Sequence, residues 1–294
     1  MCASLTPDWS PKSKIVQNVV TELREDGIFL IGINRPEKRN CVNHETALQL
    51  TAAFQEFEKK PDALVGVLYG KGNNFCAGYD LKELAATTAE TVNAWHSESK
   101  QFRLLGPSKM TFSKPVIAAV NGYAVAGGLE LTLLCDLRVV EETTTMGVFC
   151  RRLGVPFFNG GTVRLPRLIG LSRAMDMILT GREVKGPEAY NIGLANRLCS
   201  HGTAFETAVE LAEDLLQFPP ECLKADRRSA YYSVFDATSY EDAFDFELKN
   251  GLPIIAKESI EGASKFANQG LGRHGSSMSL SSLNLSDDAA NSKL

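Results

Sequence analysis

Glu130 is the side chain best placed for acid–base chemistry in this sequence, because a small-residue turn lies just before it. The turn at 126–128 (Ala-Gly-Gly) follows an apolar run at 115–120, and a helix is expected to begin at Leu129. The first N–H groups of a helix have no intrahelical partners and lie at its positive end, and glycines let a ligand approach them closely. The spacing predicts a carboxylate beside donors for an oxyanion, although a packing turn with a capping glutamate gives the same pattern.

A second stretch with the same layout lies upstream. Residues 71–81, KGNNFCAGYDL, follow an apolar run at 63–70 and form a small-residue turn that ends in Asp80, an acidic residue opening a helix. Two such turns, each following an apolar strand, can supply the two N–H donors of an oxyanion hole. Together the stretches favour a site that stabilises negative charge on a carbonyl oxygen next to a general base.

The order of several motifs adds a family resemblance. FCAGYDLKEL at 75–84 is followed by PVIAAVNGYAVAGGLELTLLCDLRVV at 115–140, LGVPFFNGGTVRLPRLIGLSRAMDMILTGREV at 153–184 and AYNIGLANRL at 189–198. In this order the motifs resemble the crotonase (enoyl-CoA hydratase/isomerase) superfamily over nearly the whole chain, residues 14–270. The resemblance implies an α/β fold, with a crotonase-like ββα superhelix (spiral) core and a C-terminal helical oligomerisation region.

The resemblance also assigns roles to residues of the two turns. The two oxyanion-hole amides would belong to Tyr79 and Gly127, with Glu130 as the acid–base group. The adenosine end of coenzyme A would lie along the first turn, and Lys38 and Arg39 would follow its phosphates, although a solvated loop explains these two cations equally well. The substrate-binding residues implied in this way are Ala77, Gly78, Tyr79, Asp80, Leu81, Lys38, Arg39 and Gly127.

Cys150 is the position where the sequence departs from the family pattern. Enoyl-CoA hydratases of this family carry a second glutamate twenty residues after the first, and that count from Glu130 ends at Cys150. A thiol, with an unperturbed pKa of about 8.5, is a poor acid–base substitute unless its pKa is lowered. The adjacent Arg151 and Arg152 would lower it if their side chains point at the sulfur, which keeps Cys150 a candidate catalytic residue. The favoured interpretation is a small, inert side chain that lines the pocket.

The expected reaction is hydration of a 2-trans-enoyl-CoA to a 3-hydroxyacyl-CoA, a step of fatty-acid metabolism, with Glu130 making both proton transfers. Double-bond isomerisation and decarboxylation of a malonyl-type CoA ester are alternatives on the same fold, although the family's single-acid isomerases keep their acid at the position of Cys150. A non-catalytic acyl-CoA-binding protein is a further alternative, disfavoured because a buried carboxylate without a task is costly. Coenzyme A is part of the substrate, and we expect no separate cofactor and no metal.

Other stretches predict the elements that position these residues. We expect a β-hairpin with strands at 15–22 and 28–34 around Asp26-Gly27, and an amphipathic helix at 45–59. Asn159 reads as a helix cap or as a hydrogen-bonding partner of a substrate or water. Further elements are expected as strands at 63–70, 115–120 and 137–140 and as helices at 129–134, 165–180, 203–218, 220–234 and 249–266.

Four regions are expected along the chain. They are a flexible N-terminus at 1–13, a crotonase core at 14–202, a C-terminal helical region at 203–270 and a disordered Ser-rich tail at 271–294. The tail ends in Ser292-Lys293-Leu294, a peroxisomal address that the import receptor reads, so we expect the protein in the peroxisome. A homotrimer, or a dimer of trimers, is expected on the resemblance alone.

The composition excludes several other classes of protein. The 294 residues carry a net charge of −4, which argues against a nucleic-acid footprint. Seven cysteines without a C-x-x-C pair suggest neither a disulfide framework nor a zinc site. No apolar run is long enough to span a bilayer.

Overall fold

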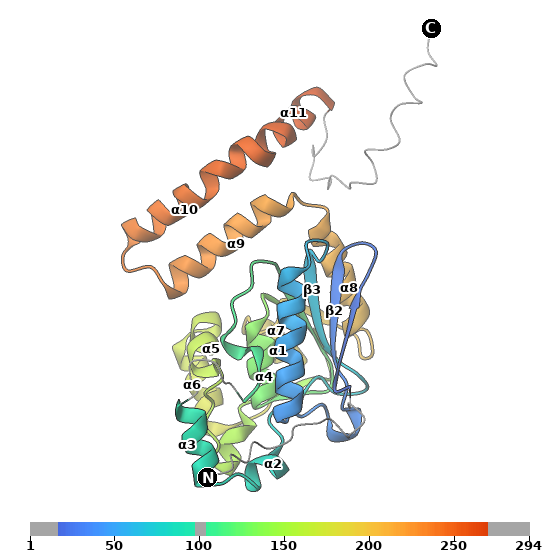
Figure 1. Cartoon of the computed structure of the whole chain (residues 1–294), viewed down its shortest axis with the longest axis vertical. Coiled ribbons are helices and arrows are strands. Elements are labelled where there is room, and N and C mark those ends of the chain that lie inside the picture. The colour runs from blue at the N-terminus through green and yellow to red at the C-terminus, as the bar shows by residue number, and fades with distance from the viewer. Residues whose placement is uncertain (1–16, 98–103, 270–294) are drawn as a thin grey trace, which may run out of the picture.

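The computed structural model describes residues 17–97 and 104–269 (Figure 1). The N-terminus predicted to be flexible at 1–13, the Ser-rich tail predicted at 271–294 and the Ser292-Lys293-Leu294 address lie outside these residues. Within them, two β-sheets and their covering helices form a compact body, and the last helices project from it.

The larger sheet is parallel except at one edge. β1 and β2 form an antiparallel hairpin, and the other neighbouring pairs run parallel in the order β1-β2-β3-β4-β6-β9. The hairpin turns at Gly27, whose φ of +94° suits a glycine, and Ile28 N donates to Asp26 Oδ1 at 3.1 Å. The strands are β1 Val19–Leu23, β2 Ile28–Ile33, β3 Val65–Gly70, β4 Val116–Val120, β6 Leu137–Glu141 and β9 Arg197–Cys199.

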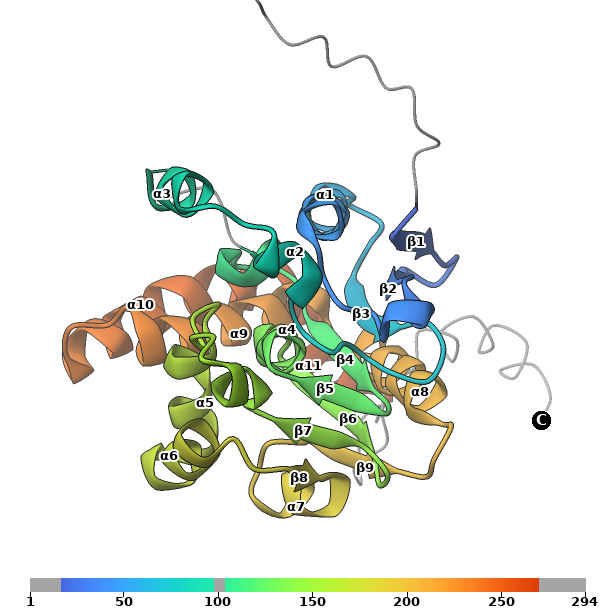
Figure 2. The same ribbon diagram turned by 90° about the horizontal axis from the view of Figure 1, so that it is seen from below.

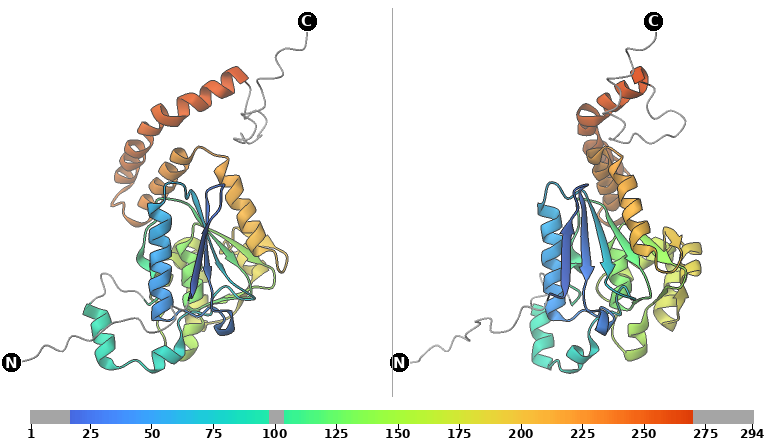
Figure 3. Two further views of the ribbon diagram at one scale, coloured as in Figure 1. Left: turned by 45° about the vertical axis from the view of Figure 1, so that its right-hand side comes forward. Right: turned by 90° about the vertical axis from the view of Figure 1, so that its right-hand side faces the viewer.

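Helices cover both faces of this sheet, which is why its central strands are apolar throughout (Figure 3). α1 (His44–Lys59) lies on one face and α8 (Ala204–Leu216) on the other. Alternate residues of β4 divide between the two layers, with Ile117 in the cluster that packs on α8 and Ala118 in the cluster that includes α1. α8 opens the predicted C-terminal helical region at 203–270, yet it packs on the sheet as part of the core.

A smaller sheet leads into the helix that carries Glu130. β5 (Tyr123–Val125), β7 (Thr145–Gly147) and β8 (Val184–Lys185) form it. One residue, Ala126, separates β5 from α4 (Gly127–Leu134). α4 is buried along its whole length and lies in the middle of the molecule (Figure 2). The prediction lacked β5 and began this helix at Leu129. Three residues are too few to show a strand period, and the partner of β5, β7, is distant in sequence.

The predicted helix at 165–180 is divided into two helices. Gly170, between α5 and α6, has a φ of +83°, which no helical residue adopts. The remaining helices are α2 Leu81–Ala85, α3 Ala89–Ser97, α5 Gly161–Ile169, α6 Leu171–Thr180 and α7 Gly186–Asn191, with 3-10 turns at Pro36–Lys38, Pro107–Lys109 and Phe149–Leu153.

The helices after α8 extend away from the sheets, and α10 (Tyr240–Ile254) lies beyond α9 (Pro220–Phe235) (Figure 1). α10 packs along α9, where the rings of Tyr232 and Phe246 stack with centroids 3.8 Å apart. A π-helical turn, Ile255–Ser259, joins α10 to α11 (Ile260–Gln269).

The start of α10 corrects another expected boundary. The sequence placed the last helical segment at 249–266, but the helix begins at Tyr240 because the Ser239 hydroxyl accepts a hydrogen bond from Asp242 N at 3.1 Å. Across the described residues, no helix has both the length and the apolar content needed to cross a membrane.

Candidate active site

The two predicted turns are in direct contact. Backbone hydrogen bonds join them, since Cys76 N donates to Tyr123 O at 2.9 Å and Val125 N donates to Cys76 O at 3.1 Å. Glycines make the approach possible: a Cβ atom added at Gly128 would lie 2.0 Å from Cys76 O. A Cβ atom added at Gly78 would lie 3.0 Å from the nitrogen at the start of α4. The first turn therefore lies against the N-terminus of the helix that carries Glu130.

The two backbone N–H groups predicted for the oxyanion hole, one in each turn, have no protein acceptor among the described residues. On either side of Tyr79, Gly78 O and Asp80 N bond to the backbone of Val42, both at 2.8 Å, so the Tyr79 N–H points to the opposite side of this extended segment. Gly127 N begins α4 and has no intrahelical acceptor. These two donors are the pair that the sequence predicted for an oxyanion hole.

Ala126 fixes the direction of the second donor. It precedes α4 with φ 53° and ψ −122°, a backbone conformation that non-glycine residues rarely adopt. Its N–H donates to Gly147 O at 2.8 Å, and its carbonyl accepts from Glu130 N at 3.3 Å. Strain of this kind costs about 1–3 kcal/mol and persists where the surrounding structure holds it.

Glu130 is 2% exposed and its carboxylate is anchored at one oxygen. Oε1 accepts from Asn159 N at 2.6 Å and from Gly161 N at 3.0 Å. Oε2 receives only a long contact, 3.4 Å, from Asn159 Nδ2. The first oxygen therefore holds the side chain in place, and the second remains available to water or substrate.

The surroundings of Glu130 raise the pKa of its carboxyl to about 7. Burial is the largest cause, because it disfavours the charged form. The N–H groups of Gly161 and Asn159 and the charge of Arg164 act in the opposite direction and limit the rise. A carboxyl with a pKa near the working pH is suited to general acid–base catalysis.

Cys150 lies in the 3-10 turn Phe149–Leu153 and is buried. Burial and the negative charge of Glu130 raise the pKa of its thiol to about 11, so the sulfur stays protonated at neutral pH. The two arginines considered as its activators are bonded elsewhere: Arg151 Nε donates to Ile178 O at 3.2 Å, and Arg152 Nη2 donates to Gly181 O at 2.8 Å. This geometry favours the inert interpretation of Cys150 over a tuned thiolate.

The residues predicted to bind coenzyme A come together beside the first turn. Ala77 N donates to Arg39 O at 3.0 Å, which holds the cationic loop against that turn. The side chains of Lys38 and Arg39 are exposed, and Leu81 is partly exposed at the start of α2. This arrangement places two exposed cations at the rim of the turn, with the Arg39 guanidinium over the ring of Tyr123 at 5.7 Å from its centroid.

Asp80 has a structural task that the sequence did not show. Its Oδ1 caps α2 by accepting from Lys82 N at 3.1 Å, and its Oδ2 pairs with Arg35 Nη2 at 3.2 Å. Burial alone would raise the pKa of Asp80, but these partners hold it below its usual value. The carboxylate is therefore engaged with protein groups, and Arg35, the third cation of the loop, is the residue that engages it.

Two further polar residues near Asn159, Arg164 and Ser108, were missing from the predicted site. Arg164 Nη2 donates to the carbonyl of Ser108 at 3.0 Å, and both residues line the same cavity as Asn159. The motif NGGT at 159–162 was the available signal. A helix does begin there, at Gly161, but the expected cap at Asn159 is wrong, because Gly160 holds the N-cap position and no side chain caps the helix. The contact between Asn159 and Glu130, 29 residues apart in the sequence, depends on the tertiary fold.

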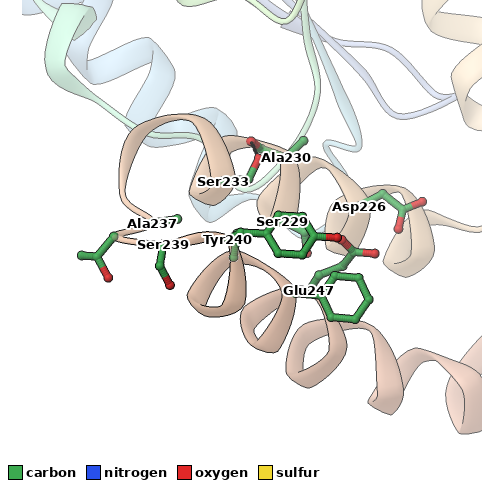
Figure 4. A pocket seen from close by; sticks show the side chains of 11 residues that line it. Asp226, Ser229, Ala230, Ser233, Ala237, Ser239, Tyr240 and Glu247 are labelled. Atoms are coloured by element: carbon green, nitrogen blue, oxygen red, sulfur yellow. Dashed lines mark hydrogen bonds between the residues drawn. The ribbon is translucent and has the colours of Figure 1, made fainter.

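Two cavities lie near the C-terminal helices. The larger, about 1140 Å³, is bounded by the segment 108–113, the start of α5, and α9 and α10. The smaller, about 700 Å³, lies between α9 and α10, with Ser229, Ser233 and Tyr240 among its lining residues (Figure 4). None of the predicted catalytic or CoA-binding residues lines either cavity, but Asn159, whose backbone N–H donates to Glu130 Oε1, lines the larger one.

Comparison with known proteins identifies the family. The family model described as enoyl-CoA hydratase/isomerase matches residues 23–271. The chain belongs to the enoyl-CoA hydratase/isomerase family. This result confirms the resemblance that the ordered motifs indicated, and with it the crotonase-like fold.

Relatives within the enoyl-CoA hydratase/isomerase family cover most of this chain. The mevalonyl-coenzyme A hydratase of Aspergillus fumigatus is 32% identical over 228 residues, which are 78% of this chain and 83% of that protein. The short-chain-enoyl-CoA hydratase of Clostridium acetobutylicum is 30% identical over 263 residues, 84% of this chain and 98% of that protein. The crystal structure of an enoyl-CoA hydratase from Mycobacterium tuberculosis H37Rv is 34% identical with a TM-score of 0.77, covering 86% of this chain and 96% of that one.

Proposed function

We propose that this protein is an enzyme that adds water across the double bond of a 2-trans-enoyl-CoA to give a 3-hydroxyacyl-CoA. The observation that carries this proposal is the contact of the two turns, with one unpartnered N–H from each and Glu130 three residues after Gly127 on the same helix. Residues three apart in a helix share a face, so the carboxylate and the donor of Gly127 serve one substrate. Enoyl-CoA hydratases among the relatives support the same reaction.

The reaction needs only the substrate, water and these groups. Tyr79 N–H and Gly127 N–H donate to the thioester oxygen, which withdraws electrons from the double bond. Glu130 takes a proton from water as the oxygen forms its bond to the β-carbon, and negative charge moves onto the thioester oxygen. Glu130 then gives its proton to the α-carbon, which restores the carbonyl and regenerates the carboxylate. Each of the two donors is expected to be worth about 3–4 kcal/mol of barrier.

A single carboxylate therefore makes both proton transfers. The protonated thiol of Cys150 has a pKa of about 11, too high to act as a base at neutral pH. Isomerisation and decarboxylation use the same enolate, and they stay open as reactions of this pocket. Hydration has the stronger support because the relatives above are hydratases.

Loss of the conjugated thioester absorbance of crotonyl-CoA tests the proposal. The Glu130→Gln variant keeps the shape of the side chain but cannot accept a proton, and we expect kcat/KM to fall by about 10²–10⁴-fold. The Cys150→Ala variant serves as the matched control, and its kcat/KM should stay close to that of the parent protein. An active Glu130→Gln protein, or an inactive Cys150→Ala protein, would contradict the assignment of roles.

The substrate's coenzyme A moiety is assigned to the first turn. The exposed cations Lys38 and Arg39 are available for its phosphates, and Ala77, Gly78 and Leu81 provide the adjoining surface. Asp80 supports this surface indirectly, through its pair with Arg35. Charge reversal at Lys38 is expected to raise KM for the CoA ester more than it lowers kcat.

The assembly and the location of the enzyme are further parts of the proposal. α10 and its continuation expose a row of large apolar side chains, which supports a homotrimer or a dimer of trimers, the assembly that family resemblance implies. Recognition of Ser292-Lys293-Leu294 by the peroxisomal import receptor would place the enzyme in the peroxisome. A fluorescent fusion that leaves this tripeptide at the C-terminus should co-localise with peroxisomes, and removal of the tripeptide should disperse it.

A further inference from the structure

Three buried polar side-chain atoms have no hydrogen-bond partner among the described residues. They are Ser108 Oγ, Asn159 Oδ1 and Arg164 Nη1. Ser108 is 3% exposed and Asn159 is 6% exposed, so bulk solvent does not compensate for the missing bonds. Buried polar groups are nearly always hydrogen-bonded, and an exception points to a water or a ligand that completes the site.

The three residues that carry these atoms belong to one cluster. Arg164 Nη2 donates to Ser108 O, and Arg164 Nη1 lies against Gly160, where an added Cβ atom would be 2.0 Å from it. Gly160 directly follows Asn159, so the missing side chain at this position leaves room for the guanidinium beside the backbone next to Asn159. All three polar residues line the cavity of about 1140 Å³.

Asn159 connects this cluster to the proposed reaction centre. Its backbone N–H and its side-chain amide face the two oxygens of Glu130, at 2.6 and 3.4 Å. The remaining atom of the same side chain, Oδ1, is the unpartnered one. Asn159 therefore links the cluster to the carboxylate that transfers protons in the proposed reaction, and none of the residues assigned to coenzyme A lines the cavity.

The donors and acceptors of the cluster select the group that would complete it. Arg164 Nη1 can only donate, Asn159 Oδ1 can only accept, and the Ser108 hydroxyl can do either. An alcohol oxygen accepts from the first and donates to the second. A carboxylate would leave Asn159 Oδ1 facing a negative oxygen, and a methyl group would leave all three atoms unpartnered.

We propose that the acyl chain of the substrate carries a hydroxyl group a few carbons beyond the reacting double bond, and that Arg164, Ser108 and Asn159 bind it. This inference rests on the proposed acyl-CoA function and names the class of acyl chain for that site. A pocket built to hydrogen-bond a hydroxyl discriminates strongly against the analogue that lacks it, because the protein's own polar atoms are then left buried and unpaired.

Binding of saturated CoA esters tests the subsite without turnover. Isothermal titration calorimetry would compare pentanoyl-CoA and hexanoyl-CoA with 5-hydroxypentanoyl-CoA and 6-hydroxyhexanoyl-CoA, and with adipoyl-CoA as the carboxylate, on the full chain. We expect one of the hydroxyacyl esters to bind at least about tenfold more tightly than the methyl-terminated ester of equal length, and adipoyl-CoA to show no such gain.

Variants assign the discrimination to the cluster. Ser108→Ala removes an atom that has no partner among the residues that the structure describes, so the fold should persist, and the hydroxyl preference is expected to fall several-fold. Arg164→Met should remove most of the preference. Arg173→Met is the control, because Arg173 is exposed on the neighbouring helix α6 and does not line the cavity. The control should keep the full preference.

The outcomes separate the two proposals. If none of the esters binds, the acyl-CoA function itself is wrong. If the esters bind but hydroxyl and methyl termini are equivalent, water alone completes the cluster and the subsite does not exist. Equal losses of affinity for hydroxyacyl and methyl-terminated esters in the Ser108→Ala variant would likewise overturn the subsite, since they would show that Ser108 has only a structural role.

Discussion

Glu130 combines burial, which disfavours its charge, with two backbone hydrogen bonds that favour it. The balance places the pKa of its carboxyl at about 7 instead of its usual 4.5. At neutral pH the group is present in both protonation states, so one side chain can take a proton from water and return it to carbon. This property is what lets the proposed reaction proceed without a second carboxylate at Cys150.

The raised pKa of Glu130 predicts a pH-dependent stability. Between about pH 4.5 and 7 the folded protein holds a proton on Glu130 that the unfolded chain releases, so this group stabilises the fold at low pH and the contribution is lost as the pH rises through 7. Above pH 7 the loss approaches an upper limit of about 3 kcal/mol.

Comparison with Glu130→Gln isolates this contribution from the other titrating groups. The glutamine does not titrate and can still accept from the N–H groups of Asn159 and Gly161, so it should be more stable than the parent protein at pH 8 and similar to it at pH 4.5. Urea unfolding at both pH values measures the difference. A difference that is the same at both pH values would show that Glu130 does not carry the shifted pKa.

The sequence located Glu130 and Gly127 because they share a single turn, where local spacing decides their relation. It did not locate the groups that hold Glu130, because Asn159 N and Gly161 N reach the carboxylate only through the tertiary fold. Ser108 and Arg164 were missed for the same reason. Residue types near one another in the sequence indicate the chemistry of a site. The pKa of the Glu130 carboxyl depends instead on backbone groups that are distant in the sequence.

At the scale of elements, the site depends on two connections fitting together. Cys76, in the turn that follows β3, forms backbone hydrogen bonds with β5. Gly128, at the start of α4, packs directly on the Cys76 carbonyl. The positive φ of Ala126 then turns the chain into α4 with its first N–H directed outward. The position of each amide is therefore set by the other turn.

Gly128→Ala is predicted to disrupt this fit. The added Cβ would lie 2.0 Å from Cys76 O and 2.8 Å from Cys76 C, which are backbone atoms, so the two turns must move apart. We expect kcat/KM for crotonyl-CoA to fall by about 10²-fold or more, because the oxyanion donors lose their alignment. The free energy of unfolding should fall by about 1–3 kcal/mol.

Gly251→Ala in α10 provides the matched control. A Cβ atom at Gly251 meets nothing within 4 Å, and its φ is not in the left-handed region. Alanine there should raise the free energy of unfolding by about 0.5–1 kcal/mol and leave kcat/KM unchanged. Full activity in the Gly128→Ala protein would mean that the oxyanion hole does not require the observed contact.

Elements with a strong local signal were predicted well. The β1–β2 hairpin follows from Asp26-Gly27, where the side-chain carboxylate and the glycine both favour the turn. β5 escaped prediction because a three-residue strand is defined by its neighbour in space. The start of α10 was missed although Ser239 is a good N-cap residue, because the apolar spacing that follows it faces outward rather than toward a core.

At the scale of the whole molecule, α9 and α10 do two things. Their inner surfaces, with Tyr231 and Phe246, help to enclose the cavity beside Asn159. α10 and its continuation also carry large apolar side chains that are more than half exposed, Tyr240, Phe244, Leu248, Leu252 and Ile255, of which the first two border the smaller cavity. Their spacing of four, four, four and three residues places them along one face of the helix. An apolar row of this length on a projecting helix is typical of a surface that another protein chain covers.

Mutation of this row tests the proposed assembly. In light scattering after size-exclusion chromatography, the parent protein should have a mass three or six times that of the 32.0 kDa chain. Phe244→Glu combined with Leu248→Glu puts two charges into the contact and should reduce the mass to that of one chain. Lys249→Glu changes the charge of α10 beside the row and should preserve the assembly.

The same variants connect assembly to the site. Because α9 and α10 enclose the cavity, the dissociated protein should lose affinity for acyl chains that reach it, while short crotonyl-CoA, held by the two turns, should still react. A parent protein with the mass of a single chain would contradict the oligomer. A dissociated variant with unchanged affinity for longer acyl-CoA esters would show that contact between copies does not hold the cavity wall in place.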